Sequence, residues 1–189
     1  MLRERAIDIV ICRTWGTVYG DDFAGRFLFD EPLFVVAALD SPWSRRSRID
    51  LADLMGEPWA LPASDTIVGM LIGHGLERAG SRLPQPQVVS NSMTVRIRLV
   101  ESAGFLTLLP LSMLHFGADR LKLKALRVKL PLESHPVEII ALRNRTLNPV
   151  AELFIKELHA LVQTMTKSGD EPAQRPRSTR KPASRDGRG

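Results

Sequence analysis

Short apolar runs alternate with amphipathic stretches along most of the chain. The runs at 7–12, 33–38, 58–61, 105–109 and 137–142 are bounded by turn-forming or polar residues, which is typical of strands buried in a sheet. Residues 88–89 predict a brief strand, and residues 126–130 alternate apolar and charged side chains with the period of a half-buried strand. We expect the glycine-rich segment 16–25 to be a loop.

Helix-start and helix-stop signals separate these strands. Thr66 lies at the predicted start of a helix that ends before Gly80, and Ser92 at the start of a second that ends at Gly104. Residues 49–54 predict a short amphipathic turn, and Pro110 begins another short helix. Asn148 followed by proline begins a long last helix. Its predicted apolar stripe comprises Val150, Leu153, Phe154, Leu158, Leu161, Val162 and Met165. Because strands alternate with helices, we expect an α/β fold with mostly parallel sheets.

Composition is that of an ordinary globular protein. The 189 residues are 44% hydrophobic and 25% charged, and the single cysteine, Cys12, excludes a disulfide framework and a multi-cysteine metal site. No apolar run approaches the roughly 18 residues of a membrane span, and no signal-peptide core follows Met1. We therefore expect a cytoplasmic protein without a membrane partner.

Positive charge is concentrated at the C-terminus. Residues 167–189 carry seven Lys/Arg and three Asp/Glu, which is +4 of the net +5 and leaves +1 for residues 1–166. A segment this poor in apolar residues cannot offset its ordering entropy, so we expect a disordered basic tail. Either it is simply solvated, which is the favoured interpretation, or it contacts polyanions weakly.

The chain offers little that could carry catalysis. It has no nucleophile elbow, phosphate-binding loop, dinucleotide fingerprint or zinc-protease motif, and its four histidines lack metal-ligand spacing. The acidic pairs Asp21-Asp22 and Asp30-Glu31 are interpreted as solvated loop charges rather than acid–base groups. We expect no enzyme activity, no cofactor and no metal.

The order and spacing of several blocks resemble the effector-binding domain of LysR-type transcriptional regulators, a relative of type 2 periplasmic binding proteins. The blocks are residues 6–11, 31–36 with 40–43, 49–54 with 58–61, 99–105 with 108–110, and 137–143 with Asn148-Pro149. One departure is Leu106, which stands where the family pattern has a second glycine. The resemblance also implies that the front of the sensing domain, the linker helix and the winged helix-turn-helix are not in this chain.

By this resemblance the chain divides into two lobes. Residues 1–33 and 137–166 correspond to an incomplete lobe I, residues 34–136 to a whole lobe II, and residues 167–189 to the tail. We expect lobe I to expose apolar surface that favours self-association, so the chain is predicted to form a homo-oligomer.

The family places its effector in the cleft between lobes, and six polar residues are candidates for holding it. In lobe I these are Arg13, which could bind a carboxylate through two hydrogen bonds, and Thr14. In lobe II they are Ser64, Thr66, Asn91 and Ser92, at helix starts where free N–H groups favour anions. The alternatives are a surface arginine at a strand end and plain helix capping.

Two functions remain open. The resemblance implies a regulatory domain that senses a small molecule, an organic acid or a sugar derivative, and whose parent binds DNA through a helix-turn-helix outside this chain. The alternative is a stand-alone solute-binding module of the same fold that takes no part in transcription.

Overall fold

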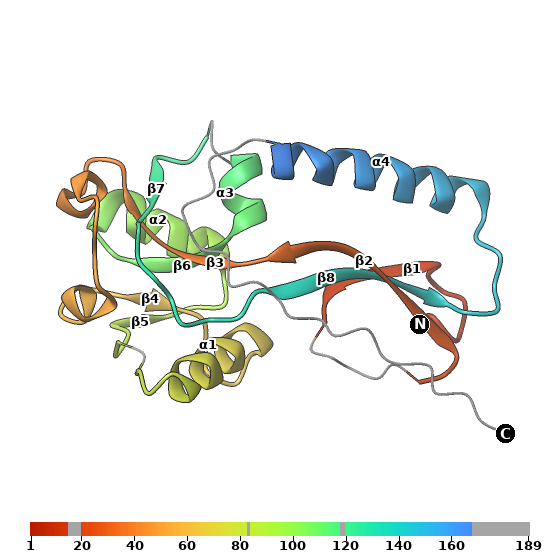
Figure 1. Cartoon of the computed structure of the whole chain (residues 1–189), viewed down its shortest axis with the longest axis horizontal. Coiled ribbons are helices and arrows are strands. Elements are labelled where there is room, and N and C mark those ends of the chain that lie inside the picture. Colours follow the sequence, from red (N-terminus) through yellow and green to blue (C-terminus); the bar gives the residue numbers. More distant parts are fainter. Residues whose placement is uncertain (15–19, 83, 118–119, 168–189) are drawn as a thin grey trace, which may run out of the picture.

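The computed structural model describes residues 1–14, 20–82, 84–117 and 120–167 (Figure 1). The predicted tail therefore lies outside the described residues from position 168 onward. In chain order the elements are β1 (Ile9–Arg13), β2 (Phe23–Glu31), β3 (Leu33–Ala38), the 3-10 turns η1 (Pro42–Arg45) and η2 (Leu51–Leu54), β4 (Ala60–Leu61), α1 (Ile67–Arg78), β5 (Val88–Val89), α2 (Met93–Ala103), β6 (Thr107–Pro110), α3 (Leu111–Gly117), β7 (Leu123–Ala125), β8 (His135–Leu142) and α4 (Pro149–Lys167).

A three-stranded antiparallel sheet in the order β1-β8-β2 forms one part of the molecule, which we call the small part. Helix α4 lies along one face of this sheet (Figure 1). Ile155 and Val162 of α4 pack there against Leu28, Val137 and Ile139 of the strands. Among the described residues β1 and β2 are the edges of this sheet, each paired with β8.

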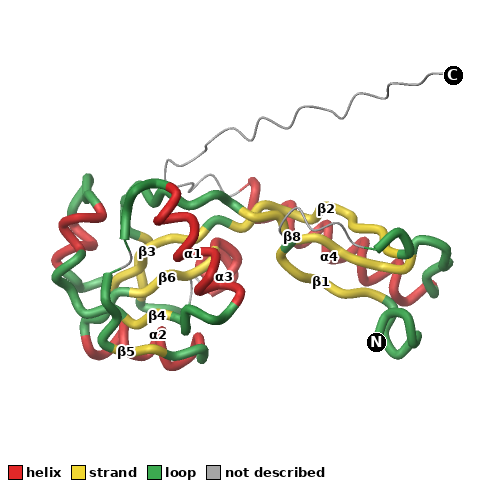
Figure 2. The backbone as a smooth tube through the Cα atoms, turned by 90° about the horizontal axis from the view of Figure 1, so that it is seen from below, coloured by secondary structure: helices red, strands yellow, loops and turns green. Residues whose placement is uncertain are grey.

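The second and larger part contains β3 to β7 and α1 to α3, and the two parts appear as separate bodies in Figure 2. Its strands β6, β3 and β7 are antiparallel, whereas β4 and β5 are parallel. Backbone hydrogen bonds from Ala60 to Leu106 (2.9 Å) and from Leu106 to Pro58 (2.8 Å) join β4 to β6. The five strands thus make one mixed sheet in the order β7-β3-β6-β4-β5.

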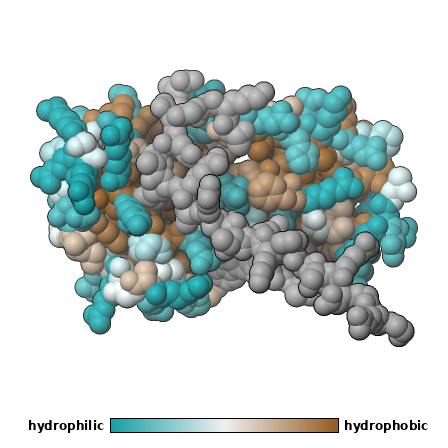
Figure 3. Space-filling view, in the orientation of Figure 1, coloured by the Kyte–Doolittle hydropathy of each residue, from teal (hydrophilic) through white to brown (hydrophobic). Residues whose placement is uncertain are grey.

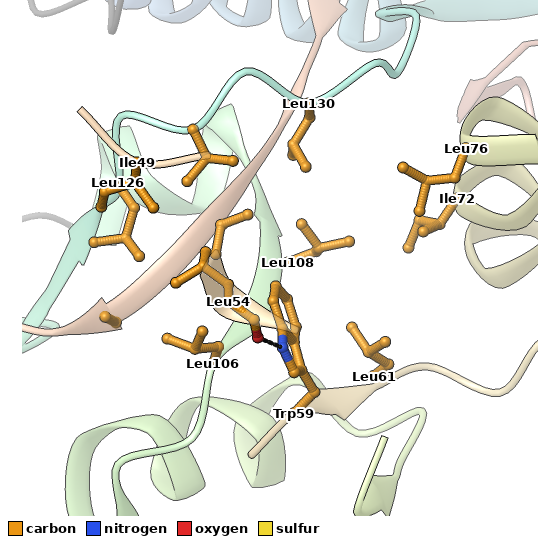
Figure 4. Close-up of a cluster of buried hydrophobic side chains, with 13 residues drawn as sticks. Ile49, Leu54, Trp59, Leu61, Ile72, Leu76, Leu106, Leu108, Leu126 and Leu130 are labelled. Carbon is orange, nitrogen blue, oxygen red and sulfur yellow. Dashed lines mark hydrogen bonds between the residues drawn. The ribbon is translucent and has the colours of Figure 1, made fainter. Parts of the chain in front are cut away.

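Alternation along the strands gives the larger sheet two covered faces. Leu108 points into the main core with Trp59 and with Ile72 of α1 (Figure 4). Val35 belongs to the same core. The next residues along the strands, such as Val36 and Leu109, pack with Ile97 of α2. The Trp59 indole N–H donates to the carbonyl of Leu54 at 2.8 Å, so its polar atom is satisfied inside the core.

The two parts are connected by chain that crosses between them twice. Strand β2 runs into β3 with only Pro32 between them, and the return path enters β8 at His135 (Figure 1). Because one crossing leaves the small part and the other re-enters it, β2 and β8 run in opposite directions.

The expectation of mostly parallel sheets was wrong, and these connections give the reason. Only strands joined through a helix are held parallel, as in β4-α1-β5 and in the parallel contact between Trp59 and Leu106. The remaining pairs, β1–β8, β2–β8, β3–β6 and β3–β7, join segments far apart in the sequence and are antiparallel. The α/β content itself is as expected.

Three further expectations failed. Residues 126–130, predicted to be a strand, form only an isolated bridge at Val128, and β7 lies just before them at Leu123–Ala125. Residues 23–25, predicted to be loop, belong to β2, an edge strand with exposed polar residues that shows little periodicity. On α4, the predicted stripe is only partly buried: Val162 and Met165 are buried, whereas Val150, Leu153, Phe154 and Leu161 are exposed. Ala151 and Ile155 occupy the buried face in their place.

Candidate functional site

Arg13 and Thr14 lie at the end of β1, beside the two crossing segments. The Arg13 guanidinium pairs with the Glu31 carboxylate at 3.3 Å (Nη2 to Oε2), and these side chains are only 17% and 9% exposed. Thr14 is buried, and its backbone N–H donates to the carbonyl of Pro136 at 2.9 Å. Arg13 is therefore a partly buried ion-pair partner rather than a fully exposed surface arginine.

Glu31 is the residue that sequence reasoning missed at this point. It was interpreted as solvated loop charge, but it is buried, and its second oxygen accepts a hydrogen bond from the backbone N–H of Ser112 at 3.0 Å. Its partners Arg13 and Ser112 are distant in sequence, so no local motif marks them. The only local hint is the position of Glu31, between an apolar strand and a proline.

His135 lies opposite Glu31 in the β2–β8 register. Burial lowers the pKa of His135, the neighbouring Arg13 charge lowers it further, and the Glu133 carboxylate opposes both by raising it. A cation, a carboxylate and an imidazole whose neutral form is favoured thus lie together beside the crossing.

The four candidates of the larger part lie where β4 and β5 end. The Asn91 side-chain oxygen accepts from the backbone N–H of Ala63 at 2.9 Å, which holds the segments that precede α1 and α2 together. Thr66 caps α1 by accepting from Gly69 N–H at 3.1 Å, and Ser92 caps α2 by accepting from Val95 N–H at 3.4 Å. Ser64 is exposed beside them.

These contacts leave side-chain donors for a ligand at Asn91 and Ser92, but not at Thr66, whose hydroxyl and backbone N–H donate to the Ala63 carbonyl at 2.6 and 3.1 Å. The Asn91 side chain uses its oxygen for Ala63, so its amide N–H groups point elsewhere, and Ser92 retains a hydroxyl hydrogen. Because β4 and β5 are parallel, both segments emerge at the same edge of the sheet. The structure thus brings Ser64, Thr66, Asn91 and Ser92 together and places Arg13 and Thr14 apart from them, at the end of β1 beside the crossing segments.

Two hollows lie away from the six candidates. One cavity of about 490 Å³ is lined by Asp40, Trp43 and Glu101 at the end of the larger part. A second, of the same volume, lies along α4 between Phe154, Leu161 and Thr164. Figure 3 shows hydrophobic side chains reaching the surface in this region, among polar ones. In the described part of the chain, no three His, Cys, Asp or Glu side chains gather as metal ligands, and no helix is long and apolar enough to cross a membrane.

Comparison with known proteins gives one family. The sequence matches the family described as the LysR substrate binding domain over residues 1–163. No curated protein matches it significantly.

Solved structures of similar fold are regulatory domains. The effector-binding domain of QuiR, in complex with shikimate, is 19% identical with a TM-score of 0.62, over 86% of this chain and 75% of that one. The Synechocystis CcmR regulatory domain, in complex with 2-PG, is 17% identical with a TM-score of 0.65, over 87% and 77%. The regulatory domain of HypT from Salmonella typhimurium is 20% identical with a TM-score of 0.62, over 87% and 77%. At such identities these structures establish a shared fold.

Proposed function

The chain belongs to the LysR substrate-binding domain family and is an effector-binding regulatory domain, and from this premise we propose that a small organic acid or sugar derivative binds between its two parts. The observation that carries the proposal is the Asn91–Ala63 hydrogen bond of 2.9 Å. It holds together the segments that lead into α1 and α2, and the free N–H groups and helix dipoles at these helix starts favour an anionic or hydroxyl-rich ligand.

The six candidates have different roles in this proposal. Asn91, Ser92 and Ser64 would supply hydrogen-bond donors from the larger part. Thr66 would shape the site as the cap of α1, since its hydroxyl and backbone N–H both donate to the Ala63 carbonyl. Arg13 and Thr14 would contribute from the end of β1. Two structures of similar fold hold shikimate and 2-PG, which are both carboxylates. A carboxylate ligand therefore has the stronger support.

The same proposal includes the two lobes of the chain, its association with a second copy of itself, and its cellular location. We assign the small part to lobe I, the larger part to lobe II, and the function to the cytoplasm. Exposed apolar residues on α4, among them Leu153 and Phe154, support association of the chain with itself.

Asn91→Asp gives a sharp test of the site. Aspartate keeps the oxygen that accepts from Ala63 but replaces the amide donors with a negative charge. Titration calorimetry of the whole chain with shikimate, 2-phosphoglycolate and a set of further organic acids and sugars should find a ligand. We expect its affinity to fall at least about tenfold in Asn91→Asp, which corresponds to about 1.4 kcal/mol.

Asn144→Asp is the matched control, since Asn144 is exposed in the turn after β8. It makes the same chemical change away from the candidate site and should leave affinity unchanged. Equal affinity of wild type and Asn91→Asp for the ligand would place the site elsewhere.

A further inference from the structure

One carboxylate ties three elements together at the crossing between the two parts. Glu31 is the last residue of β2, its Oε2 lies 3.3 Å from Arg13 Nη2 at the end of β1, and its Oε1 accepts from Ser112 N–H of α3 at 3.0 Å. Arg13 belongs to the small part and Ser112 to the larger one. Glu31 thus contacts both parts while sitting on the segment that joins them.

A second bond attaches α3 to the same segment. The backbone N–H of Leu111 donates to the carbonyl of Pro32 at 3.0 Å, so consecutive residues of α3 are bound to consecutive residues of the crossing. Pro32 has a fixed φ, which restricts the chain immediately after Glu31. The beginning of α3 is therefore positioned by the crossing segment, with Glu31 supplying the side-chain half of the attachment.

The burial of Glu31 makes this arrangement sensitive to charge. A carboxylate that is 9% exposed is held at a large desolvation cost unless it is paired and hydrogen-bonded. Here the compensation comes from Arg13 and from the Ser112 N–H. Glu31 in turn occupies one side of the Arg13 guanidinium and fixes which of its five N–H donors remain for other groups.

We propose that Glu31 is a positioning residue of the effector site, which orients Arg13 and holds α3 against the crossing segment. Its relevance to an effector rests on the proposed function, whereas the arrangement itself does not. A ligand carboxylate that reaches Arg13 meets the guanidinium in the orientation set by Glu31. A change in that pairing is transmitted to α3 through the same carboxylate.

The experiment compares Glu31→Ala and Glu31→Gln with wild type in the full chain. Hydrogen exchange is followed at the Ser112 amide, and thermal midpoints are measured in sodium acetate and in sodium chloride at equal ionic strength. We expect exchange at Ser112 to be at least about tenfold faster in Glu31→Ala, with Glu31→Gln between it and wild type. Glu133→Gln, an exposed change near the same crossing, is the control and should match wild type.

Acetate separates positioning from a general loss of stability. If Arg13 and the Ser112 amide form a carboxylate site that Glu31 normally fills, acetate should raise the midpoint of Glu31→Ala by a few degrees more than chloride does, roughly the effect of 1 kcal/mol. The gain should vanish in the double variant Glu31→Ala with Arg13→Met. Equal acetate effects in the single and double variants, or Ser112 exchange in Glu31→Ala within twofold of wild type, would overturn the proposal. Because no effector is used, a chain that binds no effector at all would refute the proposed function and leave this result standing.

Discussion

A buried arginine in the larger part gives the most quantitative prediction. Arg96 of α2 is 4% exposed, and its Nη1 donates to the Thr107 hydroxyl and to the carbonyl of Leu108, each at 3.1 Å. Thr107 is fully buried, and its hydroxyl in turn donates to the carbonyl of Ala60 at 2.6 Å. The Arg96 Nε is buried with no hydrogen-bond partner among the described residues, and burial lowers the pKa of the guanidinium.

Thr107→Val removes the hydroxyl while nearly preserving its shape. It leaves the Ala60 carbonyl and one Arg96 N–H buried without partners, and each such loss costs about 1–3 kcal/mol. We expect the free energy of unfolding to fall by about 3 kcal/mol. Arg96→Met should change it by no more than about 1 kcal/mol, because removing the charge also removes its desolvation cost.

The double variant Arg96→Met with Thr107→Val distinguishes the loss of buried hydrogen bonds from a simple loss of packing. With Arg96 already replaced by Met, Thr107→Val leaves only the Ala60 carbonyl unsatisfied, so it should cost about 1 kcal/mol, a coupling of about 2 kcal/mol. Urea unfolding of the four chains measures these values. A double variant less stable than Thr107→Val alone, or a loss clearly above about 1 kcal/mol for Arg96→Met, would refute the reasoning.

Three shorter predictions follow from the same structure. Gly69→Ala should destabilise α1 because its Cβ would overlap the carbonyl oxygen of Ala63, whereas Gly73→Ala meets nothing within 4 Å and should stabilise the chain by about 0.5–1 kcal/mol in urea unfolding. Folding lowers the pKa of His135, so the unfolded chain binds more protons near pH 6.5, and the free energy of unfolding should fall as the pH drops from 7.5 to 5.5. In thermal unfolding, His135→Gln should weaken this pH dependence of stability. The same pH dependence in the variant and in wild type would contradict the prediction. Phe154→Gln, at a 50% exposed position on α4, should reduce self-association in sedimentation experiments while changing stability by less than about 0.5 kcal/mol; unchanged sedimentation would exclude this face from the contact.

Local signals predicted the elements whose boundaries are set locally. Ser92 and Gly104 bracket α2 as expected, because the serine accepts from Val95 and the glycine adopts φ 71°, which only glycine tolerates easily. Strand β3 matches its predicted run at 33–38, since a strand covered on both faces shows as an uninterrupted apolar segment.

Pairings between distant segments were beyond the same reasoning. The exposed residues of α4 could not be told from the buried ones, because Phe154 and Ile155 are equally apolar and only the position of the sheet distinguishes them. Strand direction likewise depends on where the chain crosses between its two parts. The spacing of apolar residues in a segment indicates whether it is a helix or a strand, but not which other segment it packs against.

In the candidate site too, residues marked by local signals were predicted and residues defined by distant contacts were missed. The capping residues Thr66 and Ser92 were found because helix starts require them, whatever else they do. Glu31 was missed because its carboxylate is compensated from β1 and from a residue 81 positions away along the chain. Removing a cap therefore perturbs its own helix first, whereas removing Glu31 perturbs the relation between helix, strand and crossing. Variants of Glu31 and Arg13 should therefore change ligand affinity more than they change helix stability. Variants of the capping residues should do the reverse.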